Sequence, residues 1–305
     1  MDSSLKQAKR VDDLLAAGDD GSPYNYEDIF RTDTWRSRRL SKRKLRALKR
    51  VDESLQAMLD EGERVFFLTF GSTVGFWESY FAGWIVYYLN QRVIALTTQR
   101  MLLMQISSGY RPRPLRFQLV YDAIVRVKGT LLGNTKIRAR NGKSYLFTRV
   151  PKADRKYIQQ LVEELRDDQP ASPSNAVAME NLCPHCHRAV AGRPRRCPEC
   201  GGRFKSASVA GWLSFLFPGL GDLYLGHWKF AIFEILCGAF IWLAFVLTDP
   251  ETTRSPADIA VEAGFVVLVI HGIDALATRH IGLKGLYPAG GTDTQEALQP
   301  DGGLT

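Results

Sequence analysis

The sequence lacks several features that would assign it to a common class at once. Its first thirty residues are polar and acidic and contain no apolar run, which argues against a cleavable signal peptide. Five cysteines among 305 residues do not form the framework of a disulfide-rich secreted protein. No nucleophile elbow, phosphate-cradling glycine loop, HExxH motif or catalytic carboxylate pair is present. We therefore expect a protein that is not an enzyme.

What the chain does have is a basic balance and an uneven distribution of apolar residues. The formal net charge is +8 and the sequence pI is about 9.3, which favours an acidic partner such as a membrane surface or a nucleic acid. Most long apolar runs lie between residues 65 and 89 and between 209 and 277. At this length the chain has room for two or three small domains.

Composition and periodicity divide the chain into six parts. We expect a polar N-terminus with a basic helix (1–62), an α+β domain (63–168), a linker (169–180), a cysteine ribbon (181–205), an apolar helical hairpin preceded by an interfacial or re-entrant lead helix that breaks at Pro218-Gly219 (208–284), and a disordered tail (285–305).

The basic helix is predicted over residues 37–59, where leucines and a valine recur at helical spacing. The thirty residues before it are expected to hold a short helix at most, followed by a loose segment. Residues 31–50 carry ten Lys/Arg against one Asp. This charge is either a solvated helical face or a surface that senses anionic lipid.

Four predicted strands precede a hairpin and a helix in the α+β domain. The strands are "RVFFLTF", the two halves of "QRVIALTTQRMLLMQI", and "FQLVYDAIVRVKGT"; the hairpin turns at Asn141-Gly142, and residues 152–168 form an amphipathic helix. With "VIALTTQRMLLM", "YDAIVRV" and "NGKSYLF", the order resembles the bacterial pleckstrin-homology-like (GRAM-like) domains. The resemblance implies a β-sandwich or barrel closed by a C-terminal helix.

Two stretches of this domain have open interpretations. Residues 71–90 are longer and more apolar than an early loop of that family, and are either a membrane span or a re-entrant or interfacial insertion. "SSGYRPRPLR" is predicted as a loop whose Arg111, Arg113 and Arg116 bind lipid headgroups, or else as a solvated hairpin.

The cysteine pairs Cys183/Cys186 and Cys197/Cys200 predict a metal site. CxxC spacing lets both thiolates of one turn face a single ion, and two such turns complete a tetrahedral set. We expect structural Zn²⁺, with a redox dithiol pair or a rubredoxin-type iron site as alternatives. The cluster resembles short zinc ribbons, and His185 and His187 are expected to be solvated.

Two apolar segments, 230–247 and 259–277, predict a transmembrane hairpin. Lys and Arg flank it while the connecting loop is acidic, which places both termini in the cytoplasm and the protein in the inner (cytoplasmic) membrane. "PGLGDLYLGHWKFAIFEIL" and "HGIDAL" resemble the two-transmembrane-helix domain family. Glu234, His271 and Asp274 are intramembrane polar residues, either functional or fixing helix packing.

These parts predict a membrane-anchored, non-enzymatic adaptor. Its pleckstrin-homology-like domain and basic ribbon would contact anionic lipid headgroups or a protein partner. The alternative is a membrane-tethered protein that binds nucleic acid through the ribbon and the basic helix, which we favour less because no base-reading element is evident. Homo-oligomerisation is left open.

Overall fold

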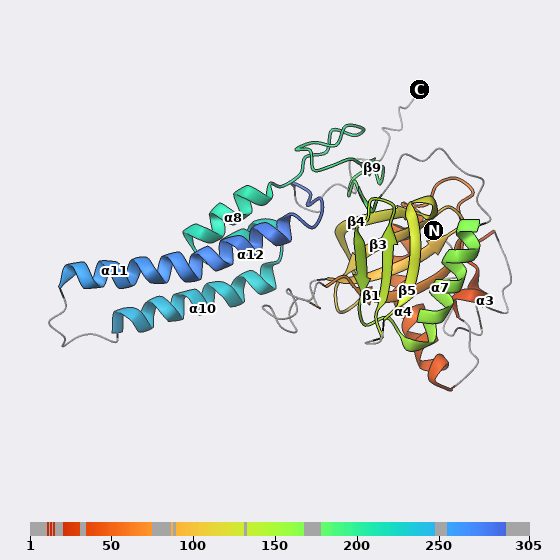
Figure 1. Ribbon diagram of the computed structural model, residues 1–305, viewed down its shortest axis with the longest axis horizontal. Helices are drawn as coiled ribbons and strands as arrows, with labels where there is room; N and C mark the ends of the chain where they lie inside the picture. The colour runs from red at the N-terminus through yellow and green to blue at the C-terminus, as the bar shows by residue number, and fades with distance from the viewer. Residues whose placement is uncertain are drawn as a thin grey trace, which may run out of the picture. The chain divides into compact units, whose positions relative to one another are not determined.

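The structure, a computed structural model, has two compact units, residues Met1–Gly192 and Arg193–Thr305. Each unit is described by itself. The residues described are Val11, Asp13, Leu15, 21–30, 35–74, Tyr87, 90–130, 133–167, 178–247 and 255–290. Most of the segment 71–90, most of the expected linker and the end of the tail lie outside them. The fold is mixed α+β with antiparallel sheets (Figure 1).

The first unit contains a six-stranded antiparallel sheet in the order β1-β2-β3-β4-β8-β9. The strands predicted in "RVFFLTF" and on both sides of "TTQR" are confirmed. Its strands are β1 (Val65–Ser72), β2 (Gln91–Thr97), β3 (Arg100–Ile106), β4 (Pro112–Val120), β8 (Glu180–Leu182) and β9 (Ala189–Val190). The first strand of the cysteine ribbon, β8, therefore joins the edge of this sheet beside β4.

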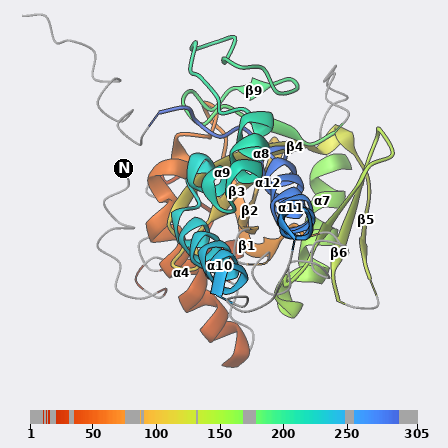
Figure 2. The ribbon, with the colours of Figure 1, turned by 90° about the vertical axis from the view of Figure 1, so that its left-hand side faces the viewer.

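A second antiparallel sheet follows a short 3₁₀ turn, η1 (Tyr121–Ala123). It contains β5 (Ile124–Gly129), β6 (Thr135–Ala139) and β7 (Ser144–Phe147). The predicted Asn141-Gly142 turn joins β6 to β7, and Gly142 adopts φ +80°, a conformation in which glycine is favoured. The predicted helix is α7 (Lys152–Asp167), which packs along β5 (Figure 2).

The basic helix is α4 (Trp35–Gln56), and it covers one face of the first sheet. Its predicted apolar stripe is buried: Leu45, Leu48, Val51 and Leu55 are each at most 7% exposed. They pack in one core with Val65, Leu68 and other residues of β1–β3. Nearly every residue of β2 and β3 is buried, because α4 covers one face of these strands and other core residues cover the opposite face. This fits their almost uninterrupted apolar sequences.

The prediction of a loose segment before the helix is wrong for residues 21–30. Tyr24 forms a β-bridge with Val65, and α3 (Tyr26–Ile29) follows, with Asn25 capping its N-terminus. Tyr24 and Phe30 are 1% exposed. The sequence hid this because four aromatic or aliphatic anchors stand among polar residues without a regular period.

A buried ion pair ties α4 to α7. Lys44 Nζ lies 3.1 Å from Asp154 Oδ1, and the two side chains are 4% and 7% exposed. Thr69 on β1 donates to the other oxygen of Asp154 at 2.5 Å, and Lys44 Nζ lies 4.1 Å from the Phe67 ring centre. Burial lowers the pKa of Lys44, and the carboxylate of Asp154 opposes this effect.

The second unit is helical, with two helices long and apolar enough to span a membrane: Trp228–Leu247 and Ala257–Gly282. The first is α10 (Trp228–Leu247). The second is continuous through α11 (Pro256–Val266), a π-helical turn η2 (Val267–His271) and α12 (Gly272–Gly282) (Figure 1). Both segments agree with the predicted hairpin, extended at both ends of the second helix.

The lead helix divides into α8 (Ala207–Leu216) and α9 (Leu220–Leu225) at the predicted Pro218-Gly219 break. Gly219 has φ +87°, so the chain reverses there at a residue without a side chain. Ten residues of α8 rise about 15 Å, half of a hydrocarbon core. The helix is thus too short to cross a hydrocarbon core, which fits both expected forms, re-entrant and interfacial.

Glycine makes the close packing of α8, α9 and α12 feasible. A Cβ on Gly221 would lie 2.1 Å from the carbonyl oxygen of Ala210 and 2.7 Å from Cγ2 of Thr278. A Cβ on Gly211 would lie 3.2 Å from the carbonyl oxygen of Ala275. The backbones of these helices therefore approach one another at glycine, as small residues allow wherever helices pack closely.

The expectation of a disordered tail from residue 285 is wrong for its first residues. Phe204 forms a β-bridge with Pro288, and the amide of Lys205 donates to the carbonyl of Tyr287 at 2.8 Å. Leu286 and Tyr287 are 4% and 2% exposed. No sequence pattern predicted this, because Leu286 and Tyr287 are only two apolar residues among polar and glycine-rich neighbours.

Candidate functional site

The four predicted cysteine ligands come together. The sulfur atoms of Cys183, Cys186, Cys197 and Cys200 all lie within 4.8 Å of one another. In a tetrahedral site with metal–sulfur bonds of about 2.3 Å, the sulfurs are about 3.8 Å apart. The cluster therefore has the ligand number and spacing for one metal ion. Cys237, exposed on α10, is not part of it.

The two CxxC turns have the same backbone hydrogen bonds. In the first, the amide of His187 donates to the carbonyl of Cys183 at 3.0 Å, and the amide of Cys183 donates to the carbonyl of Arg188 at 2.9 Å. In the second, Gly201 and Gly202 repeat this pattern around Cys197 at 3.0 and 2.8 Å. His187 and Gly201 occupy matching positions with φ +60° and +72°.

His187 therefore closes the first CxxC turn as Gly201 closes the second, a structural role that was not predicted from the sequence. It is a non-glycine residue in the left-handed region, where most residues are strained. Burial, followed by the charge of Arg116, lowers its pKa to about 4. Its imidazole is therefore not the solvated group that we expected.

A buried arginine lies beside the first cysteine turn. Arg116 on β4 is the register partner of Leu182, the residue that precedes Cys183. Its Nε and Nη1 atoms are buried and have no hydrogen-bond partner among the described residues. Burial lowers its pKa to about 10, and the nearby Cys183 opposes that shift. A thiolate on Cys183 would offer this guanidinium a charged acceptor, so the surroundings fit a thiolate–metal site.

The three arginines predicted to bind lipid therefore separate. The segment is a hairpin, as in the second interpretation, and the predicted loop is wrong from residue 112 onwards because β4 begins there. Arg111 is exposed at the β3–β4 turn, Arg113 is half-buried, and the Nε and Nη1 atoms of Arg116 are buried. Pro112 pairs with Ile106 at an irregular end of the ladder, where a strand can begin with proline.

Two of the three predicted intramembrane polar residues meet at the break between α8 and α9. The amide of Gly219 donates to Asp274 Oδ2 at 3.2 Å. A Cβ on the same glycine would lie 3.1 Å from Cβ of Glu234. Glu234 Oε2 is buried with no hydrogen-bond partner among the described residues. Glu234 of α10 and Asp274 of α12 thus both border this turn, and their carboxyl groups lie close enough to interact.

His271 makes separate contacts. Its Nδ1 lies 2.9 Å from the carbonyl oxygen of Phe215, and its Nε2 lies 3.2 Å from Trp242 Nε1. A carbonyl only accepts and an indole N–H only donates, so the proton is on Nδ1 and the ring is neutral. His271 thereby connects the end of α8 to α10 and α12, as expected of a group that fixes helix packing.

Further buried polar residues, not predicted from the sequence, adjoin Glu234 and Asp274 in this unit. Asp222 is fully buried and accepts from Thr278 Oγ1 at 2.9 Å, while its other oxygen lies 2.9 Å from His227 Nδ1. Ser214 donates to Thr278 at 3.0 Å. The signal available was an aspartate between Gly221 and an apolar run. Its partners come from three other segments, which no local pattern connects.

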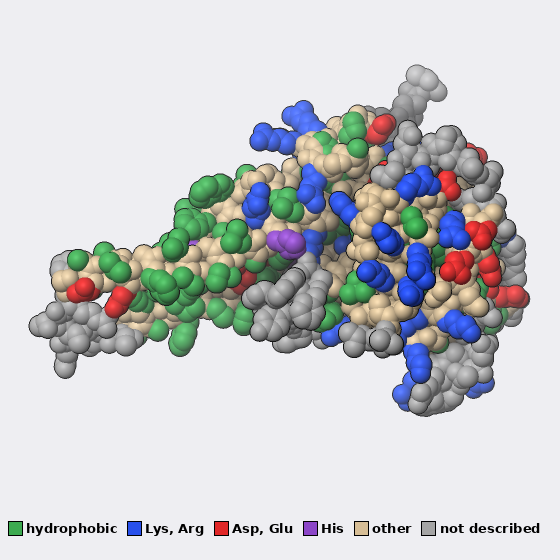
Figure 3. Space-filling view, viewed as in Figure 1, with side chains coloured by type: hydrophobic (Ala, Val, Ile, Leu, Met, Phe, Trp, Pro, Cys, Tyr) green, Lys and Arg blue, Asp and Glu red, His purple; other side chains and the backbone are tan. Residues whose placement is uncertain are grey.

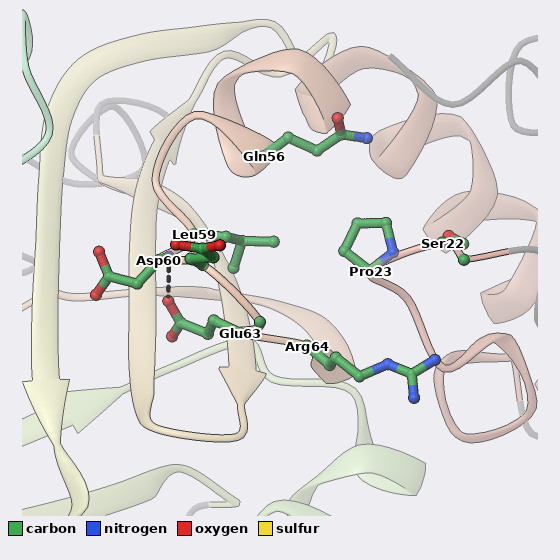
Figure 4. Close-up of a pocket in the computed structure, with 10 residues that line it drawn as sticks. Ser22, Pro23, Gln56, Leu59, Asp60, Glu63 and Arg64 are labelled. Atoms are coloured by element: carbon green, nitrogen blue, oxygen red, sulfur yellow. Dashed lines mark hydrogen bonds between the residues drawn. The ribbon is translucent and has the colours of Figure 1, made fainter.

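The first unit has a pocket of about 480 Å³ between the end of α4 and the start of β1 (Figure 4). Two of its acidic residues, Asp60 and Glu63, are ion-paired with Arg100. Arg100 Nη2 lies 2.6 Å from Asp60 Oδ2 and 2.8 Å from Glu63 Oε2, and Thr97 donates to Glu63 at 2.5 Å. These contacts between Arg100 and the two carboxylates stabilise the β2–β3 turn. Arg100, which lies in the "TTQR" segment between the two strands, therefore has a structural role.

Comparisons with known proteins add little. No protein-family profile and no curated protein matches the chain. Similar solved structures include the C-terminal domain of an unknown protein from Leishmania infantum, at 10% identity and TM-score 0.29, over 39% of this chain and 99% of that one. Two structures of the linker-DH/PH domains of p115-RhoGEF match at 11% and 10% identity and TM-scores of 0.28 and 0.29, over 45% of each chain. This chain thus spans less than half of those two chains, and likenesses this slight carry no argument.

The class of the protein therefore follows from its own parts. It joins a mixed α+β unit of antiparallel sheets, a four-cysteine cluster suited to a metal ion, and a helical unit with two helices of membrane-spanning length.

Proposed function

We propose that this chain is a membrane-anchored, non-enzymatic adaptor. Its helical hairpin lies in the inner (cytoplasmic) membrane with both termini in the cytoplasm. Its α+β unit is a pleckstrin-homology-like module that contacts anionic lipid headgroups or a partner protein. Its four cysteines hold a structural Zn²⁺ ion, and the hairpin belongs with the two-transmembrane-helix domains.

Exposed apolar side chains support the anchoring. Only 11% and 6% of the most apolar windows of the two long helices are buried, which is unlike the core helices of a water-soluble protein. Phe240 and Leu268 are 70% and 69% exposed, and Trp212 on α8 is 70% exposed. A continuous apolar surface of this kind requires lipid or protein to cover it. Lys229 and Arg279 at the hairpin's ends, against an acidic connecting loop, support the orientation.

Strand order supports the pleckstrin-homology-like assignment. Four antiparallel strands, a second sheet of three strands and one closing helix follow in the order that the sequence resemblance implies. Such a module contacts ligands through its surface. At the pocket between α4 and β1, Asp60 and Glu63 are both ion-paired with Arg100, as expected of residues with a structural role.

Zinc is the ion that the ligands favour. Four thiolates in a closed tetrahedral set are typical of structural zinc, and they leave no open position for a substrate. Arg116 would hydrogen-bond to Cys183 and reduce the net negative charge of the loaded site, while the ion would stabilise a ribbon too small to have a core of its own.

The observation that carries the proposal is that one chain joins membrane-length helices to a strongly cationic unit. Residues 92–166 contain sixteen Lys/Arg against four Asp/Glu. Each basic residue near an anionic leaflet contributes roughly 1 kcal/mol of attraction. The unit would therefore be drawn to the same membrane that anchors it.

Full-length protein in nanodiscs of neutral lipid tests this proposal. The nanodiscs are immobilised, and vesicles with or without 30% phosphatidylserine are passed over them at low and high salt. We expect salt-sensitive binding of the anionic vesicles alone, and elemental analysis should give one zinc per chain. Absence of binding at low salt would refute a lipid-contacting adaptor.

The alternative function, nucleic-acid binding, has one supporting observation. The outward face of α4 carries a row of exposed cations, among them Arg38, Lys42 and Arg46. The same immobilised nanodiscs exposed to duplex DNA or single-stranded RNA test it. Binding of nucleic acid without binding of anionic vesicles would favour this function over the first.

A further inference from the structure

The second sheet has a cationic outer face that the sequence analysis did not single out. From Ala123 to Ala153 the chain has eight Lys/Arg and no Asp or Glu. Strand alternation sends Val127 and Ile137 into the core, where they are 2% and 1% exposed. It therefore sends Arg126 and Lys128 of β5, and Lys136 and Arg138 of β6, to the outer face, where all four are exposed.

Register places like charges directly opposite each other on this face. Arg126 pairs with Arg138, and Lys128 pairs with Lys136. These two pairs are named the cationic ladder. Basic side chains also gather over this part of the unit in the space-filling view (Figure 3). Like charges directly opposite on neighbouring strands destabilise a sheet.

No acidic side chain within the described residues offsets the charge repulsion in the ladder. The four side chains make no ion pair or hydrogen bond within the described part of the chain. At the rim, Arg140 is bonded to the carbonyl of Asp122, and Lys143 adds another exposed cation beside the β6–β7 turn. An unpaired arrangement of this kind contrasts with Lys44 and Arg100, each of which has a carboxylate partner.

We propose that the cationic ladder is the surface through which the α+β unit contacts an anionic lipid bilayer. This inference rests on the proposed adaptor function and names the face that performs it. Neighbouring strands lie about 4.8 Å apart and alternate residues along a strand about 6.7 Å apart, so the four charges form a nearly flat array. A flat array suits a plane of headgroups better than one small anion, which needs a concave site.

Two further features favour a bilayer over nucleic acid. The two membrane-length helices of the same chain keep a bilayer at high effective concentration. The residue beside the ladder on β5, Val125, is an apolar side chain 53% exposed, and Leu146 of β7 is paired with Lys136. Aliphatic side chains can enter the headgroup region, whereas single-stranded nucleic acid is bound through aromatic side chains, which β5 and β6 do not contain.

The test uses full-length protein in neutral nanodiscs and vesicles containing 30% phosphatidylserine. Two ladder variants, Arg126→Gln/Arg138→Gln and Lys128→Gln/Lys136→Gln, each remove one opposed pair. A control variant, Lys42→Gln/Arg46→Gln, removes the same charge from the exposed face of α4. At roughly 1 kcal/mol, or about fivefold, per basic residue at the surface, each ladder variant should lose about 30-fold in vesicle affinity. The control should lose less than threefold.

The outcomes separate the ladder from the adaptor function. If wild type binds anionic vesicles and the ladder variants bind as tightly as the control, the ladder is the wrong face while the adaptor function stands. If wild type binds no anionic vesicles, the adaptor function fails and the ladder inference fails with it. If the ladder variants lose binding of RNA or DNA while wild type ignores vesicles, the partner is nucleic acid and the inference is overturned.

Discussion

Gly221 makes a sharp test of how the helical unit is packed. Its missing side chain leaves room for the backbone of α8, because a Cβ there would lie 2.1 Å from the carbonyl oxygen of Ala210, 2.6 Å from Ser214 Oγ and 2.7 Å from Thr278 Cγ2. The nearest of these atoms belongs to a helix backbone and cannot rotate away. We expect Gly221→Ala to displace α9 from α8 and α12, and with it Asp222, which accepts from Thr278.

The magnitude follows from two opposing terms. Alanine in place of glycine within a helix gains about 1 kcal/mol, while forcing atoms into a packed core costs about 1–3 kcal/mol and more where a backbone is struck. Gly272→Ala is the matched control, because Gly272 lies in α12 with nothing within 4 Å of its Cβ position and so receives only the gain. The gain is common to both variants, so they should differ in stability by the steric cost alone, about 1–3 kcal/mol.

Thermal unfolding of the full-length protein in detergent measures this difference. Fluorescence of Trp212, Trp228 and Trp242 reports on the helical unit. A shift of about 4–8 °C per kcal/mol is usual for a unit of about a hundred residues, so Gly221→Ala should melt roughly 5–20 °C below Gly272→Ala. Equal midpoints for the two variants would refute the close approach of α8, α9 and α12.

Three further outcomes are expected. Lys44→Met should destabilise the first unit by about 3 kcal/mol, because Asp154 stays buried, and Lys44→Met/Asp154→Leu should recover most of the loss in chemical denaturation; equal losses would contradict a buried pair. Burial, followed by Asp52, raises the pKa of Tyr24 in the folded state. Since the native state then keeps a proton that the unfolded chain releases above pH 10, stability should fall by up to about 1.4 kcal/mol per pH unit there, and Tyr24→Phe should reduce this slope in denaturation curves. Arg116→Met should weaken zinc binding about 10- to 100-fold in chelator competition, while Arg111→Met leaves it unchanged; equal affinities would remove Arg116 from the metal site.

The sequence carried enough information for elements whose signal is local. Strand alternation, the Asn141-Gly142 turn and the two long apolar runs predicted β1–β3, the β6–β7 hairpin and the helical hairpin, because each depends on neighbours along the chain. The cysteine cluster was predictable for the same reason, since CxxC spacing alone brings two thiolates together.

Elements that depend on distant partners were missed or misplaced. Residues 21–30 are ordered by pairing with Val65 and by packing under α4, and Tyr287 by pairing with Lys205. Arg116 was assigned to a lipid-binding loop, yet it lies on β4, and β8 from beyond residue 178 completes the sheet beside it. The cationic ladder escaped notice because opposition of like charges depends on register across two strands.

The π-helical turn at Val267–His271 limits which insertions and deletions this chain can accept. Such a turn contains one residue more than an α-helix needs over the same rise, so it sets the angular phase between α11 and α12. Losing a single residue there would restore a regular α-helix and rotate everything on one side of it by about 100° relative to the other. His271, Asp274 and Thr278 share the inward-facing side of the C-terminal half, whose partners are Phe215, Gly219 and Asp222. Substitution of the exposed residues of α11 should therefore be tolerated, whereas the chain length between Val266 and Gly272 is constrained by partners more than forty residues away.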